Sequence, residues 1–154
     1  MATDVEKFYN YVTGYSKPRN LNKISISPVN LRKTLNQNID KEISNAKKGK
    51  HAEIWAKMNS LVDPQIIDKF YEASSVGVKV FLFVRGVCCL RPGIKNKSEN
   101  IIVKSIIGRF LEHSRIYCFA NGKFMPNRNA KVYISSADLM PVSYTHLTLP
   151  TTDR

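Results

Sequence analysis

EIWAKMNSLVDPQIIDKFYEASSVGVKVFLFV, residues 53–84, contains two strand patterns separated by one helix pattern. In the first strand pattern Ile54, Ala56 and Met58 recur at every second position, which predicts one buried strand face. The second, residues 78–84, is almost continuously apolar and is typical of a strand covered on both faces. A strand, a helix and a strand within about 30 residues predict a βαβ unit with parallel strands and a right-handed crossover.

Capping signals delimit the helix of this unit and predict a second helix before it. Asp63 is a capping aspartate followed by Pro64, and the helix is expected to close at Gly77. The same signals predict another helix after Pro28, with a terminating glycine at Gly49. Its apolar stripe recurs at helical spacing and comprises Leu31, Leu35, Ile39, Ile43 and Ala46.

The rest of the chain supplies further strand patterns. Strands are expected at KISIS (23–27), NIIVKSII (100–107), RIYCFA (115–120) and KVYISSAD (131–138), and one or two helical turns at GRFLEH (108–113). NGKFMPNRN, between the last two strands, has the composition of a hairpin loop. KPRNLNK, before the first strand, is a candidate linker. Together these elements predict an α/β fold, a mixed sheet flanked by helices.

Composition narrows the class of protein and of ligand. A chain of 154 residues is the size of one ordinary domain. Its net charge of +12 and pI near 9.8 favour polyanionic ligands such as nucleic acid, nucleotides, anionic lipid or polyphosphate. Cys88 and Cys89 are adjacent and the third cysteine stands apart, so a disulfide framework is not expected. The cysteines instead favour a protein of the reducing cytoplasm. The sequence shows no secretory signal and no apolar run of the roughly 18 residues that a membrane span needs.

Several familiar catalytic and binding motifs are missing from the sequence. It contains no Walker loop, no Gly-x-Gly-x-x-Gly, no Cys-x-x-Cys, no His-Glu-x-x-His and no Gly-x-Ser-x-Gly. Metal binding by the cysteines is therefore not expected. His51 stands beside a lysine cluster and is interpreted as a surface residue.

Two residues remain as candidates for chemistry on phosphate. Arg85 comes directly after the buried strand 78–84, and ligands of open α/β sheets bind outside the carboxyl ends of the strands. His113 precedes another strand and is flanked by Arg109 and Arg115. Guanidinium groups bind phosphate oxygens in pairs, and imidazole can donate a proton to them. The alternative for His113 is a half-buried histidine without a chemical role.

A family resemblance extends this interpretation. AKMNSLVDPQIIDKFYEASSVGVKV, VRGVCCLRPG, SENI, GRFLEHSRIY and KVYISSAD resemble the C-terminal region of bacterial polyphosphate kinase, as do FYNYVTGYS and PVNLR. The resemblance covers about residues 4–140 and implies a phospholipase D-like fold, in which two related α/β domains face each other around a tunnel. It also implies reversible transfer of the terminal phosphate of ATP to inorganic polyphosphate through a phosphohistidine.

The resemblance assigns roles residue by residue. Arg85 matches the arginine of the family's VRG motif and His113 the histidine of FLEHSR, and both line the family's ATP and phosphate site. His113 would be an auxiliary residue in phosphoryl transfer, with Arg109 and Arg115 holding negative charge nearby. The phosphohistidine and the Mg²⁺ ligands are expected upstream of this sequence. The expected partners are ATP, ADP and polyphosphate, without nucleic acid. A homo-oligomer is expected for the full-length protein, in the cytoplasm, where the inner face of the membrane is one location that the resemblance allows.

The resemblance also suggests how the chain is divided. Residues 1–22 resemble the end of the first catalytic domain and 23–140 most of the second, so the fold is expected to be truncated at both ends. Residues 141–154 look like a non-family tail of artefactual origin, which removes His146 from the functional argument. Phe81 and Leu139 depart from the family pattern, as does the long loop between the last two strands.

Two alternative functions have less support from these residues than the polyphosphate kinase interpretation. A phospholipase D-type phosphodiesterase would need His-x-Lys-x-x-x-x-Asp, and HSRIYCFAN lacks that lysine and that aspartate. A basic nucleic-acid-binding domain would need aromatic side chains exposed beside basic ones. Most aromatic residues here fall within helix stripes and strands instead.

Overall fold

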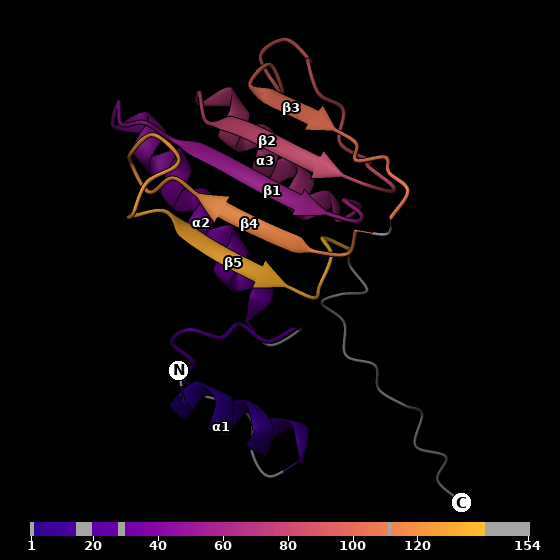
Figure 1. Cartoon of the computed structure of the whole chain (residues 1–154). Coiled ribbons are helices and arrows are strands. Elements are labelled where there is room, and N and C mark those ends of the chain that lie inside the picture. The colour runs from indigo at the N-terminus through magenta and orange to yellow at the C-terminus, as the bar shows by residue number, and fades with distance from the viewer. Residues whose placement is uncertain (1, 15–19, 28–29, 111, 141–154) are drawn as a thin grey trace, which may run out of the picture.

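A five-stranded mixed sheet is the centre of the computed structural model, which describes residues 2–14, 20–27, 30–110 and 112–140 (Figure 1). The strands are β1 (Glu53–Met58), β2 (Lys79–Val84), β3 (Ile101–Lys104), β4 (Arg115–Phe119) and β5 (Lys131–Ser135), in the spatial order β3-β2-β1-β4-β5. The helices are α1 (Ala2–Val12), α2 (Leu31–Lys47) and α3 (Pro64–Ser75). The sequence patterns predict all of these elements except α1.

The predicted βαβ unit is confirmed. β1 and β2 are parallel, with Ile54 opposite Val80, and α3 connects them. β3 continues the parallel part of the sheet beside β2. On the other side β4 pairs antiparallel to β1, and β5 pairs antiparallel to β4, as the hairpin loop predicts. The carboxyl ends of β1, β2 and β3 therefore meet the start of β4 at one edge of the sheet, on the right in Figure 1.

The core lies between one face of the sheet and the helices α2 and α3, which both lie behind the sheet in Figure 1. Alternate strand residues point into it because side chains alternate between the two faces of a strand. Its most deeply buried members include Ile39, Ile54, Met58, Ile66, Leu82 and Tyr117. Full burial of one such side chain contributes about 1.5–3 kcal/mol, so this layer fixes the sheet that carries the site.

The predicted capping signals act at both ends of α3 and at the end of α2, whereas α2 begins only at Leu31, after Asn30, which makes no side-chain capping hydrogen bond. The Asp63 carboxylate accepts hydrogen bonds from the backbone N–H groups of Gln65 and Ile66, at 2.9 and 3.4 Å. It also forms an ion pair with Arg32 of α2 at 2.6 Å, which ties the two helices together. Beyond the last turns Gly49 and Gly77 adopt positive φ angles of 69° and 93°, as glycines that terminate helices commonly do.

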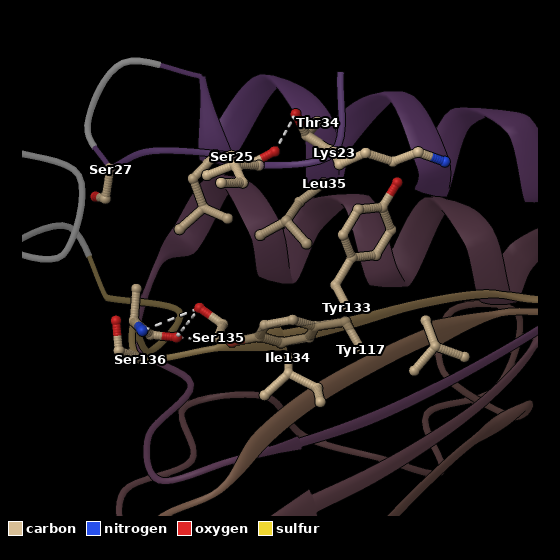
Figure 2. A pocket seen from close by; sticks show the side chains of 14 residues that line it. Lys23, Ser25, Ser27, Thr34, Leu35, Tyr117, Tyr133, Ile134, Ser135 and Ser136 are labelled. Atoms are coloured by element: carbon tan, nitrogen blue, oxygen red, sulfur yellow. Dashed lines mark hydrogen bonds between the residues drawn. The ribbon is translucent and has the colours of Figure 1, made fainter. Parts of the chain in front are cut away.

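The strand predicted at residues 23–27 does not form. The Asp4 carboxylate accepts hydrogen bonds from the backbone N–H groups of Lys23, Asn22 and Ile24, and these bonds lower the pKa of Asp4. The segment then runs along α2, where the Ser25 hydroxyl bonds that of Thr34 at 3.0 Å (Figure 2). A hollow of about 430 Å³ separates it from β5. The backbone N–H groups at the start of residues 23–27 are thus bound by the Asp4 side chain instead of by a neighbouring strand. The alternation of isoleucines could not reveal this contact.

The opposite face of the sheet carries a row of apolar side chains that crosses all five strands. The register aligns them in the order Ile102, Phe81, Trp55, Cys118 and Val132. Phe81 is only half-buried and Trp55 is 37% exposed. The prediction that β2 is covered on both faces is therefore wrong within the described residues, because α2 and α3 both lie on the other side.

We expect this open face to make the 154-residue chain self-associate, since exposed apolar patches of this kind favour association. Val132 and Ile134 are 59% and 84% exposed on β5. Replacing both with lysine should weaken association about tenfold or more, because the change removes apolar contact area and adds like charges. Sedimentation velocity over a concentration series measures the effect, with Gln65→Lys on α3 as a control. A concentration-independent monomer of the unmodified chain would contradict this expectation.

The interpretation of His51 as a surface residue is also wrong. His51 lies near the start of β1 and is half-buried rather than a surface residue. Its Nε2 is 2.9 Å from Oε2 of Glu53, and its ring stacks on Phe124 with centroids 3.9 Å apart. These contacts attach the loop between β4 and β5 to the far edge of the sheet. His51 is thus a structural residue, remote in the fold from the strand ends that carry the candidate site.

Candidate functional site

Arg85 occupies the predicted place at the carboxyl edge of the sheet. Its backbone N–H donates to the carbonyl of Met58 at 3.2 Å, which continues the β1–β2 pairing by one residue. Its guanidinium Nη1 donates to the carbonyl of Glu112 at 3.0 Å. Gly86 follows, and a Cβ there would lie 3.1 Å from the carbonyl oxygen of Asn59. Glycine thus lets the loop pass closely over the end of β1.

His113 lies at the same edge because β4 runs antiparallel to β1. It is exposed and lies two residues before Arg115, the first residue of β4. Its Nδ1 is 3.4 Å from Nδ2 of Asn59, the residue that follows β1. Since Arg85 bonds the residue next to His113, the two sequence-predicted candidates are brought together although 27 positions separate Arg85 from Glu112.

A hollow of about 380 Å³ opens beside these residues. Its lining includes Arg85 and Arg109 together with Glu112, Ile106, Ile107, Gly108 and Phe110. Ile107 and Phe110 are 93% and 85% exposed. In the described part of residues 108–113 the backbone forms a bend and irregular structure, so the predicted helical turns are wrong there. The bend places Arg109 on the same hollow as Arg85.

Glu112, in the segment before β4, forms an ion pair with Lys57 of the neighbouring strand β1. Its Oε1 lies 2.7 Å from Nζ of Lys57 and accepts hydrogen bonds from the hydroxyl and backbone N–H of Ser114. The hydrogen bond from Lys57, followed by those from Ser114, lowers the pKa of Glu112 from its ordinary 4.5 to about 2. Its carboxylate therefore stays ionised at neutral pH and is occupied by groups of this chain.

A pH titration can test the Lys57–Glu112 pair. Because the pKa of Glu112 is lower in the folded chain, its pairing stabilises the fold above pH 4.5 and is lost as the pH falls toward about 2. We expect Lys57→Met to raise the pKa of Glu112 toward its ordinary value, as followed by carboxyl ¹³C NMR. Lys69→Met, which removes an ion pair between the helices α2 and α3, is the matched control. An unchanged titration of Glu112 in Lys57→Met would contradict the contact.

Arg115 makes contacts within the chain that its sequence pattern does not reveal. Its Nη2 lies 2.8 Å from Oδ2 of Asp138, and its Nη1 donates to the carbonyl of His113 at 2.9 Å. The hydrogen bond that Arg115 donates to Asp138 raises the pKa of Arg115, whose charge is thus balanced within the chain. Arg115 supports the backbone of His113 and holds Asp138, whereas Arg109 is exposed on the hollow.

Sequence reasoning missed three residues of this site, namely Asn59, Lys57 and Asp138. Asn59 directly follows a strand that ends at the same edge as β2. The argument that selected Arg85 could therefore have found it. Lys57 and Asp138 carry no comparable local signal, because their partners Glu112 and Arg115 are brought near only by strand pairing. Among the described residues no group of three or more His, Cys, Asp or Glu side chains could hold a metal ion.

Comparison with known proteins identifies the family. The family model described as polyphosphate kinase C-terminal domain 2 matches residues 24–146. The chain belongs to this family. The matched range contains the whole sheet with α2 and α3, and it includes the first six residues of the stretch 141–154, which was predicted to be a non-family tail.

Individual relatives agree with this assignment. A polyphosphate kinase of Erythrobacter litoralis is 56% identical over 140 residues, which are 91% of this chain and 20% of the relative. One from Prochlorococcus marinus is 52% identical over 141 residues, or 92% and 19% of the two chains. The crystal structure of polyphosphate kinase from Porphyromonas gingivalis superposes with a TM-score of 0.84 at 37% identity, covering 92% of this chain and 21% of that one. The chain thus spans about a fifth of these relatives, and its α/β architecture is the expected phospholipase D-like fold.

Proposed function

We propose that this chain forms part of the ATP- and polyphosphate-binding site of a polyphosphate kinase. The observation that supports the proposal most is the meeting of Arg85 and His113 at one sheet edge, beside a hollow that Arg109 also lines. The family membership and the polyphosphate kinase relatives support the same reaction, reversible transfer of the terminal phosphate of ATP to polyphosphate.

Arg85 would bind phosphate oxygens. A guanidinium offers five N–H donors in a planar fork, and the hydrogen bond described for this one is made by Nη1 to Glu112. Its remaining donors suit the paired oxygens of a phosphate group. Because Arg85 follows a buried strand directly, its main chain is fixed and its side chain needs little ordering on binding.

His113 would stabilise or protonate an oxygen during transfer. In that step the bond from the terminal phosphorus to the bridging oxygen of ATP breaks, and a bond forms to a histidine nitrogen elsewhere in the longer protein. In a second step the phosphoryl group passes to the end of a polyphosphate chain. The imidazole of His113 would donate a hydrogen bond or proton where negative charge develops.

Magnesium is expected for the reaction, but the residues at this edge do not suit its binding. Mg²⁺ prefers carboxylate and other oxygen ligands. The carboxylate of Glu112 already pairs with Lys57 and Ser114, and that of Asp138 is occupied by Arg115 and by the backbone N–H groups of Asn59 and Ser60. The ion would therefore be held by other parts of the longer protein.

The setting of the reaction is also part of the proposal. Residues 1–22 would end one catalytic domain and 23–140 would form most of the next, with ATP, ADP and polyphosphate as partners and a homo-oligomer as the full-length assembly. A reducing, cytoplasmic setting is supported by the free thiols of Cys88, Cys89 and Cys118. No helix in the described ranges combines the length and the apolar character needed to cross a membrane.

A chimeric enzyme tests the proposed activity. In the Erythrobacter litoralis protein the aligned 140 residues are replaced by those of this chain, and ATP-dependent polyphosphate synthesis is measured. We expect the chimera to synthesise polyphosphate and the 154-residue chain alone to be inactive, because phosphoryl transfer needs several groups positioned together. A folded chimera without synthesis would count against the proposal. Turnover by the chain alone would contradict the expectation that it lacks the phosphohistidine.

A further inference from the structure

Asn59 is held by its backbone from two sides. Its N–H donates to Oδ1 of Asp138 at 2.8 Å, and the same carboxylate oxygen accepts from the N–H of Ser60 at 3.3 Å. Its carbonyl accepts from the N–H of Gly86 at 2.7 Å. The turn after β1 is thus clamped between the end of β2 and the segment after β5, and it presents the Asn59 side chain in a fixed position.

The Asn59 side chain belongs to a closed network of hydrogen bonds that includes His113, Arg115 and Asp138. The amide Nδ2 of Asn59 lies 3.4 Å from Nδ1 of His113. The carbonyl of His113 accepts from Nη1 of Arg115 at 2.9 Å, and Nη2 of Arg115 lies 2.8 Å from Oδ2 of Asp138. Asp138 thus binds Asn59 with one oxygen and Arg115 with the other. The ring of His113, through Asn59, and the backbone of His113, through Arg115, are therefore both positioned by the carboxylate of Asp138.

We infer that Asn59 is a positioning residue, which selects the tautomer of His113. An amide N–H that faces Nδ1 makes this nitrogen the acceptor, so the neutral ring carries its proton on Nε2. Nε2–H is then the donor available to a ligand. The assignment of that ligand as a phosphoryl oxygen rests on the proposed function, whereas the tautomer does not.

The chemistry of position 59 makes the inference testable. Aspartate at this place can only accept a hydrogen bond when ionised, so it would draw the ring proton to Nδ1 and leave Nε2 without one. Leucine has a similar size and offers no polar group, so it would release the ring. Ser60→Ala is the matched control, because Ser60 shares the Asp138 carboxylate through its backbone alone.

The experiment uses the 154-residue chain labelled with ¹⁵N at its three histidines, whose signals are assigned by single replacements. We expect the His113 ring of the unmodified chain to show Nε2–H and a hydrogen-bonded acceptor at Nδ1. Asn59→Asp should move the proton to Nδ1. Asn59→Leu should remove the hydrogen-bond shift of Nδ1, and Ser60→Ala should change neither. Circular dichroism verifies folding of each variant.

Two results would overturn the inference: an Nδ1–H ring in the unmodified chain, or identical His113 signals in folded Asn59→Leu and Asn59→Asp. In the chimeric enzyme, Asn59→Leu should lower kcat about tenfold with a nearly unchanged KM, the loss expected for one hydrogen bond. If the tautomer changes as expected but inorganic tripolyphosphate leaves the His113 signals unmoved and the chimera is inactive, the positioning role stands and the proposed function fails.

Discussion

His113→Ala in the chimeric enzyme is expected to lower turnover about 10²–10⁴-fold, the range for losing a general acid or base. ATP affinity should change little, because the proposed work of the imidazole is on charge or protons in the transition state. His113 is exposed and directly follows Glu112, which lines the hollow and accepts a hydrogen bond from Arg85. Steady-state rates and nucleotide affinity are measured together on the variant and its parent.

His51→Ala is the control for this prediction. His51 is the same residue type at the opposite edge of the sheet, where it contacts Glu53 and Phe124. Its replacement should affect stability and leave turnover near that of the parent. A folded His113→Ala enzyme with near-normal turnover would end the catalytic role, and a histidine without a chemical function would then be the correct interpretation.

Arg85→Lys is expected to weaken ATP binding about 10–100-fold although the charge is kept, since hydrogen bonds to charged groups contribute about 1.5–3 kcal/mol. Lysine is a point charge and cannot reproduce a paired contact to two phosphate oxygens. It also lacks the planar fork through which Arg85 reaches the carbonyl of Glu112 while facing the hollow. Equilibrium binding of ATP to the chimera measures the loss.

Arg128→Lys provides the comparison for Arg85→Lys. Arg128 is exposed in the loop between β4 and β5, at the edge of the sheet opposite the site. This replacement should leave ATP affinity unchanged. Equal affinities of the Arg85→Lys and parent enzymes would show that Arg85 acts only as a positive charge or does not touch the nucleotide.

The parts of the fold that sequence could predict are those with local signals. The Asp63 cap, the terminating Gly77 and the alternation in β1 lie within 53–84, and the βαβ unit follows from them with Arg85 at its end. The strand predicted at 23–27 does not form, because Asp4 binds the backbone at its start. Sequence could not predict this contact, since Asp4 lies 18 to 20 positions before the residues that it binds. No alternation rule contains that contact.

The support around His113 shows the other limit of sequence reasoning. Asn59 lies 54 positions from His113 and 79 from Asp138, and strand order alone brings them together. Sequence predicts that Arg115 holds negative charge near His113, because its own charge is visible in sequence, whereas its pairing with Asp138 is not. The open face of the sheet is a similar case, since an apolar run does not show which side the helices cover.

Protection of arginines by ATP tests the central claim, that phosphate binds at the edge of the sheet formed by the ends of β1 and β2 and the start of β4. The chimeric enzyme is treated with phenylglyoxal with and without ATP, and the modification of each arginine is quantified by mass spectrometry. We expect ATP to protect Arg85 and Arg109, which line the hollow, and to leave Arg128 as reactive as before. Protection of Arg128 with Arg85 still modified would contradict the claim, because the ligand would then bind at the opposite edge.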